Sequence, residues 1–276
     1  MKKLGLIAGG GQLPLRLAEH CRMAGRPYFV IRLRGFAEAP MLAYPGAEAG
    51  IAEFGKVFDL LKREDCEAVC MAGVVKRPDF NALKPDLRGL RSLPGAIAAA
   101  RKGDDALLRF VLGEFEREGF AIEGADQVAD ELTLGEGVLG RVHPAEEHRD
   151  DVALGVKVAE AMGALDIGQA VVAAGGVVLA VEAQEGTDAM LARTAALPAA
   201  LRGTDTQRLG VLVKWPKPIQ DRRIDLPVVG IRTVEGAASA GLAGVVVQAG
   251  AALIVDRAGV TEAADRLGLF ILGLSQ

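Results

Sequence analysis

This chain of 276 residues has little of what marks several common functional classes. It has only three cysteines and 4% aromatic residues, so a disulfide-stapled scaffold is excluded. Its net charge of −4 argues against a broad basic face for nucleic acid. No apolar run approaches the roughly 20 residues that a membrane-spanning helix needs. What remains is an ordinary globular protein in which any basic site must be local.

The few cysteines and histidines do not form a metal or catalytic set. We expect Cys21, Cys66 and Cys70 to be buried, reduced thiols, which places the protein in the cytoplasm. The N-terminus begins like a signal peptide, but glycines and then Arg16 interrupt its apolar segment too early. The three histidines are isolated surface or capping residues in this interpretation: His20, His143 and His148.

The first half of the chain reads as alternating strands and helices. An apolar strand at 4–8 is followed by three glycines and a helix with Pro14 near its start, and further strands are expected at 28–33 and 68–75. Strands that alternate with helices predict an α/β fold with a parallel sheet. The apolar spacing at 104–118 predicts an amphipathic helix with Asp104 as its N-cap.

The second half is α/β with a mixed sheet. The apolar runs 171–174 and 177–181 flank Gly175 and Gly176, which is a strong hairpin signal. A glycine-rich stretch at 124–140 separates the halves, so we expect domains at 1–132 and 133–276. Further strands are expected at 209–215, 245–247, 253–255 and 270–272, and helices at 151–162, 189–197 and 236–242.

The first glycine loop only partly matches a dinucleotide-binding fingerprint. Pro14 stands where the third glycine of G-x-G-x-x-G belongs, and the second strand ends near Arg32 and Arg34 rather than an acidic residue. This weakens the nicotinamide-cofactor interpretation. Backbone amides at the helix start could still hold an anion, and a purely structural turn is the equal alternative.

Two clusters of charged residues lie in the second half. Residues 182–188 hold three carboxylates, Glu182, Glu185 and Asp188, which could build a cation site, although capping alone would explain Thr187 and Asp188. Residues 214–227 combine two lysines, two arginines, two aspartates and three prolines, a stiff and charged segment suited to phosphate chemistry. A solvated surface loop is the plain alternative.

The order of these motifs along the chain carries a family resemblance. Residues 4–14, 103–105, 166–169, 182–188 and 214–227 together resemble the LpxI family of UDP-diacylglucosamine pyrophosphatases almost from end to end. The resemblance implies a Rossmann-like first domain, a three-layer α/β second domain and a lipid-bearing substrate enclosed between them. It further implies a Mg²⁺-dependent hydrolase of lipid A biosynthesis in Gram-negative bacteria, which releases UMP and 2,3-diacylglucosamine 1-phosphate.

The resemblance and the charge pattern together assign roles to individual residues. The resemblance implies that Asp225 is the key catalytic residue, and we expect Asp221 to be a weaker second carboxylate and Lys214 a phosphate clamp in the catalytic set. The expected Mg²⁺ ligands are Asp225, Asp188 and Glu182. Substrate-binding residues are expected at nine positions: Gly10, Gly11, Gln12, Gln169, Gly186, Thr187, Lys217, Gln220 and Arg222.

Charge placement alone does not separate hydrolysis from binding. A non-enzymatic sensor that binds a nucleotide-sugar lipid between its domains would use the same phosphate clamps, so this alternative stays open. We expect no nucleic-acid partner, a cytoplasmic location and transient contact with the inner-membrane surface where the lipid substrate resides. The sequence does not fix the oligomeric state, and a homodimer is compatible with it.

Overall fold

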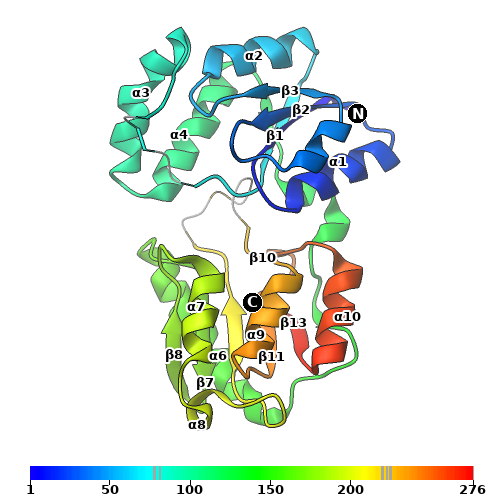
Figure 1. The fold of residues 1–276 in the computed structure, drawn as a ribbon, viewed down its shortest axis with the longest axis vertical. Coiled ribbons are helices and arrows are strands. Elements are labelled where there is room, and N and C mark those ends of the chain that lie inside the picture. Colours follow the sequence, from blue (N-terminus) through cyan, green and yellow to red (C-terminus); the bar gives the residue numbers. More distant parts are fainter. Residues whose placement is uncertain (77–78, 81, 219–220, 222, 224–225, 276) are drawn as a thin grey trace. The chain divides into compact units, whose positions relative to one another are not determined.

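A computed structural model describes residues 1–76, 79–80, 82–218, 221, 223 and 226–275. The chain divides into two compact units, Met1–Asp130 and Glu131–Gln276, and each is an α/β unit (Figure 1). No described helix combines the length and the apolar character that crossing a membrane would require.

The first unit is built on a five-stranded parallel sheet in the order β3-β2-β1-β4-β5. The strand order reverses at β1, so the glycine loop after β1 lies at a topological switch point, where α/β sheets bind ligands. This confirms the Rossmann-like parallel sheet. The strands are β1 Leu4–Ala8, β2 Tyr28–Leu33, β3 Gly46–Ala49, β4 Ala68–Ala72 and β5 Ala121–Ile122.

Helices flank this sheet. Residues of α2 and α4 join one face of it in a core that includes an aromatic cluster of Phe58, Phe115 and Phe120, with ring centroids 5.0 to 6.3 Å apart. Helix α1 contacts β1 and β2. The helices are α1 Leu13–Met23, α2 Phe54–Arg63, α3 Leu87–Ala100, α4 Asp104–Arg117 and α5 Ala125–Val128, with 3₁₀ turns η1 Ala39–Ala43 and η2 Asp130–Leu132.

The second unit has a six-stranded mixed sheet in the order β6-β13-β11-β9-β7-β8. Strands β9, β11 and β13 are parallel, whereas β7 runs antiparallel to both β8 and β9, and β6 runs antiparallel to β13. A separate parallel pair joins β10 to β12. The strands are β6 Gly137–Leu139, β7 Ala170–Ala174, β8 Val177–Val181, β9 Val211–Lys214, β10 Val228–Val229, β11 Gly244–Gln248, β12 Leu253–Ile254 and β13 Phe270–Leu274.

Helices cover both faces of this second sheet, which confirms the three-layer arrangement. Along β9, Val211 and Val213 pack in the core that α6 covers, while Leu212 packs in the core shared with α7, α9 and α10. This alternation follows from the two-residue period of a strand. The helices are α6 Arg149–Ala164, α7 Gly186–Ala195, α8 Ala199–Arg202, α9 Ile231–Ser239 and α10 Arg257–Leu267, with a 3₁₀ turn η3 at Glu146–His148.

The glycine hairpin forms as predicted. Gly175 and Gly176 have φ angles of +61° and +77°, values that L-residues with side chains rarely adopt. Their backbone N–H groups donate to the buried Asp151 carboxylate of α6 at 3.1 and 2.8 Å. The carboxylate therefore holds the hairpin against α6, and Asp151 has a structural role.

Several sequence predictions were wrong in detail. Asp104 is the first residue of α4 and Gly103 is its N-cap, since a carboxylate within the first turn is also favoured by the helix dipole. Thr187 and Asp188 lie inside the first turn of α7, and Glu185 is its N-cap. Helix α9 begins five residues earlier than predicted, and α3 and α10 were not predicted at all. The three cysteines are free and buried, as expected.

Candidate active site

Three of the polar segments singled out in the sequence meet at one edge of the second sheet. Strands β8, β9, β11 and β13 all end at this edge, because β8 and β9 both run antiparallel to β7 and the other two are parallel to β9. Strand β7 begins there. Residues 166–169 precede β7, residues 182–188 follow β8, and the charged segment follows β9. Carboxyl edges of α/β sheets are where ligands usually bind.

Backbone hydrogen bonds hold these segments in register. The Trp215 N–H donates to the Gln169 carbonyl at 2.9 Å, and the Glu182 N–H donates to the Ala170 carbonyl at 2.9 Å. Lys214 at the end of β9 lies opposite Ala170 at the start of β7. Gln169, Glu182 and Lys214 are therefore brought together by strand pairing rather than by flexible loops.

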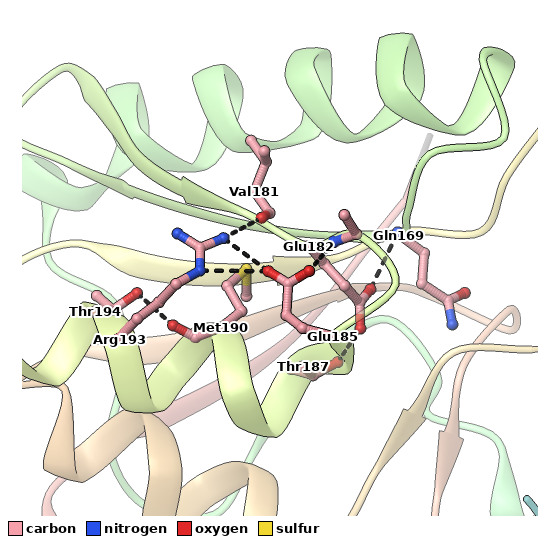
Figure 2. A network of polar contacts seen from close by, with 9 residues as sticks. Gln169, Val181, Glu182, Glu185, Thr187, Met190, Arg193 and Thr194 are labelled. Atoms are coloured by element: carbon pink, nitrogen blue, oxygen red, sulfur yellow. Dashed lines mark hydrogen bonds and ion pairs between the residues drawn. The ribbon is translucent and has the colours of Figure 1, made fainter. Parts of the chain in front are cut away.

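The Glu182 carboxylate connects two of the predicted site residues (Figure 2). Its Oε2 accepts a hydrogen bond from the Gln169 backbone N–H at 3.1 Å, and its Oε1 accepts one from the Thr187 hydroxyl at 2.7 Å. Glu182 is only 7% exposed. A buried carboxylate with a hydrogen bond on each oxygen is well satisfied, so Glu182 fixes the start of β7 relative to the start of α7.

A glycine makes this arrangement sterically possible. A Cβ atom on Gly168 would lie 2.2 Å from the Glu182 carbonyl oxygen, far inside van der Waals contact. The two backbones can approach this closely only because residue 168 has no side chain. The sequence Gly168-Gln169 is thus fitted to the end of β8.

The other two carboxylates of the acidic cluster have separate partners. Arg193 donates to the Glu185 carboxylate at 3.0 Å and to the Val181 carbonyl (Figure 2). The pKa of the Glu185 carboxyl is lowered, first by a hydrogen bond from the backbone N–H of Glu185 itself and then by the Arg193 guanidinium. Asp188 forms an exposed ion pair with Arg232 of α9. Each of the three carboxylates therefore has partners of its own: Glu182 a backbone N–H and a hydroxyl, and Glu185 and Asp188 one arginine each.

Two lysines lie at the same edge of the sheet. Lys214 is 6% exposed, and its Nζ donates to the Val228 carbonyl at 2.8 Å. Lys217 forms an ion pair with Asp166 at 2.7 Å, and both side chains are largely buried. Asp166 has a φ of +55°, a conformation that Asp tolerates better than most residues. The pair joins the charged segment to the loop before β7.

Beyond residue 218, the structure describes only residues 221, 223, 226 and 227 of the charged segment 214–227. Arg223 donates to both carboxylate oxygens of Asp221, with its Nη2 at 2.6 Å from Oδ2. This contact is local, two residues along the chain. The predictions for Gln220, Arg222 and Asp225 lie outside the described residues.

The glycine loop of the first unit is shaped by close backbone contacts. The Gly10 N–H donates to the Val74 carbonyl at 2.9 Å, and the Val74 N–H donates to the Gly10 carbonyl at the same distance. Gly11 has a φ of +87°, and its N–H donates to the Glu38 carboxylate at 3.2 Å. The Gln12 side chain makes no capping bond to α1. Glu38 thus accepts from the loop an N–H that could otherwise face an anion.

Comparison with known proteins identifies a family that covers nearly the whole chain. The family model described as the LpxI N-terminal domain matches residues 3–132, and the LpxI C-terminal domain matches residues 135–272. The chain belongs to the LpxI family. It is also 61% identical over 274 residues to "UDP-2,3-diacylglucosamine pyrophosphatase LpxI" of Caulobacter vibrioides, covering 99% of this chain and 98% of the relative.

Within this LpxI-family fold, the tertiary structure brings together Gln169, Glu182, Gly186, Thr187, Lys214 and Lys217 at one sheet edge. Asp188 also lies there but is paired with Arg232 on the neighbouring helix. Gly10, Gly11 and Gln12 belong to the other unit. Sequence reasoning missed Asp166, Arg193, Arg232 and Glu38 as partners of site residues. Only Asp166 carried a signal, because it stands in one of the family motifs.

The described carboxylates do not form a closed metal cage. Across the described part of the chain, no three His, Cys, Asp or Glu side chains gather as a metal site. Mg²⁺ does not need one, because it keeps several waters and usually binds one or two carboxylates together with substrate phosphates. The carboxylates of Glu182 and Asp188 at this sheet edge are donors of the type that Mg²⁺ binds, whereas Asp225 lies outside the described residues.

Proposed function

We propose that this LpxI-family enzyme hydrolyses the diphosphate of UDP-2,3-diacylglucosamine to UMP and 2,3-diacylglucosamine 1-phosphate, a step of lipid A biosynthesis. The observation that carries the proposal is the 61% identity to the named Caulobacter pyrophosphatase over nearly the full length of both chains. The polar edge of the second sheet supports it, since cations and carboxylates converge there at strand ends. The relative is named as a pyrophosphatase, and this favours hydrolysis over the alternative of a non-enzymatic sensor.

The proposed chemistry is mainly positioning and charge neutralisation. Lys214, Lys217 and Arg222 hold the non-bridging diphosphate oxygens, and Asp225, with Asp221 as a weaker second carboxylate, orients the attacking water. Water forms a bond to the sugar-side phosphorus, and the bond from that phosphorus to the bridging oxygen breaks. UMP leaves with the bridging oxygen, while a water proton passes to the Asp225 carboxylate. Hydrolysis in ¹⁸O-labelled water should therefore label 2,3-diacylglucosamine 1-phosphate and leave UMP unlabelled.

We propose Mg²⁺ as the cofactor, held by Asp225 and Glu182 with Asp188 as a further carboxylate. When bound, the ion supplies positive charge to the diphosphate oxygens. Gly10, Gly11, Gln12, Gln169, Gly186, Thr187 and Gln220 are proposed substrate contacts. A cytoplasmic location, transient contact with the inner-membrane surface and a homodimer also stay proposals.

A direct assay tests the proposed function. The purified chain is supplied with UDP-2,3-diacylglucosamine and Mg²⁺, and UMP release is measured with and without a chelator. We expect release with Mg²⁺ and its loss with the chelator. Substrate binding without any UMP release would favour the sensor instead.

A second prediction separates the charge of Glu182 from its hydrogen bonds. In Glu182→Gln the amide oxygen can still accept from the Gln169 N–H, and the amide nitrogen can donate to a rotated Thr187 hydroxyl. We expect the free energy of unfolding to change by less than about 1 kcal/mol. The Mg²⁺ concentration for half-maximal turnover should rise about tenfold, because the carboxylate charge is lost.

Thr187→Val is the matched control for this prediction. It removes the hydroxyl donor but keeps the Glu182 charge, so we expect a loss of about 1 kcal/mol in stability and an unchanged Mg²⁺ requirement. If Glu182→Gln also leaves the Mg²⁺ requirement unchanged, Glu182 only ties β7 to α7 and is not a metal ligand.

A further inference from the structure

Helix α3 buries unusually little of its own apolar surface. Of its 14 residues, only Gly89 and Ala100 are buried. Leu87 is 81% exposed and Leu90 is 57% exposed. Two such leucines within one turn are costly to leave in water, since full burial of a leucine stabilises a protein by roughly 1.5 to 3 kcal/mol. A partner that covers this face of α3 would therefore be favoured.

The exposed residues Leu87, Leu90 and Pro94 and the half-buried Ile97 share one side of the helix. Leu87, Leu90, Pro94 and Ile97 are spaced by three, four and three residues, which places them on a continuous face. The inward side is fixed elsewhere, because a Cβ on Gly89 would lie 1.8 Å from the Ala52 carbonyl oxygen. With Gly89 against that backbone, the face of Leu87 and Leu90 stays turned outward.

The charged side chains that α3 itself carries are basic, while the acidic residues Asp86, Glu114 and Glu118 contact it as an N-cap, through Ser92 and through Arg88. From Leu87 to Gly103 the chain carries four basic residues, Arg88, Arg91, Arg101 and Lys102, and no acidic residue. Arg88 is paired with Glu118 and lies 5.0 Å from the Phe58 ring centroid. Arg91 and Arg101 are exposed. Basic residues beside an exposed apolar face are typical of helices that lie on an anionic lipid surface.

We propose that α3 docks on an anionic phospholipid bilayer. Leu87 and Leu90 enter the boundary between headgroups and acyl chains, and Arg91 and Arg101 bind lipid phosphates. The choice of a bilayer rests on the proposed function, because a substrate with two acyl chains resides in a membrane. Docking through α3 would keep the enzyme where that substrate is.

Vesicle binding without substrate tests this surface independently of catalysis. The full chain is sedimented with vesicles of phosphatidylglycerol and phosphatidylcholine in equal parts. We expect Leu87→Ser/Leu90→Ser to weaken partition at least about tenfold. Leu42→Ser/Leu201→Ser is the matched control, because these leucines are 72% and 46% exposed and lie outside α3. The control should bind the vesicles like the wild type.

A charge variant gives a second, independent readout. Arg91→Gln/Arg101→Gln should weaken binding to the anionic vesicles about tenfold or more and abolish most of its salt dependence. Arg22→Gln/Arg149→Gln, which changes two other exposed arginines, should not. Binding to vesicles of phosphatidylcholine alone should be weak for all four variants.

Two results would overturn the proposal. One is that both α3 variants bind the anionic vesicles as strongly as the wild type does. This would show that another surface binds lipid or that none does. The other is a loss of turnover by Leu87→Ser/Leu90→Ser on a short-chain, water-soluble substrate analogue, which would assign the leucines to the substrate's own acyl chains. Failure of UMP release in the wild type would instead reject the proposed function and leave the vesicle result unaffected.

Discussion

Replacing Asp225 with asparagine is expected to lower turnover of UDP-2,3-diacylglucosamine by at least about a thousandfold while substrate still binds. Asparagine keeps the shape of the side chain but has no negative charge and cannot accept a proton at neutral pH. If Asp225 orients the attacking water and holds Mg²⁺, both contributions are lost together. Turnover is measured as UMP release, and the substrate Kd by calorimetry.

Asp221→Asn is the control within the same segment. Both oxygens of Asp221 accept hydrogen bonds from Arg223, so this carboxylate is already engaged in a local ion pair. We expect its loss to reduce turnover about tenfold or less, mainly by loosening Arg223. If Asp225→Asn retains near-normal turnover, Asp225 has no part in the chemistry.

The second large effect that we expect is a loss of stability when Gly168 is replaced with alanine. The new Cβ would lie 2.2 Å from the Glu182 carbonyl oxygen, and neither backbone can move without disturbing β7 or β8. Overpacking of this kind costs about 1 to 3 kcal/mol. The melting temperature should fall by about 3 to 10 °C, as measured by scanning calorimetry.

The same substitution should also impair the site. A shift of Glu182 would break its bonds to the Gln169 N–H and the Thr187 hydroxyl, so UMP release should fall along with stability. Gly135→Ala is the matched control, because no atom lies within 4 Å of its Cβ position. Its stability should stay within about 0.5 kcal/mol of the wild type. Equal stability of the two variants would mean that the close approach at Gly168 is absent.

Local sequence patterns predicted much of the fold because many elements carry their own signals. Strands β1 and β2 match the predicted bounds, since a mostly apolar run needs no distant partner to be recognised. The hairpin at Gly175 was also correct, because two glycines satisfy the turn by themselves. Helix α3 was missed because Gly89, Pro94 and Gly95 lie inside it, and such residues normally mark the end of a helix in a sequence.

Helix starts were predicted less well, because side chains that could cap a helix also form contacts elsewhere in the fold. Thr187 and Asp188 are typical capping residues, yet α7 begins at Gly186, and the Thr187 hydroxyl donates to Glu182 instead of capping the helix. The partner that draws this hydroxyl away lies on the preceding strand end, and the Glu182 carboxylate is buried by the surrounding fold. A capping rule considers only neighbours along the chain.

The sequence alone determined the family, the α/β class of both halves and the residue types available for phosphate chemistry, because these depend on composition, periodicity and the order of motifs. Only the tertiary structure decided which of those residues meet. Glu182 lies beside Gln169, and Lys217 beside Asp166, 51 residues away, because antiparallel pairing of β7 with β8 and β9 brings their ends to one edge. Contacts between distant residues follow from strand order, and strand order is a property of the folded sheet.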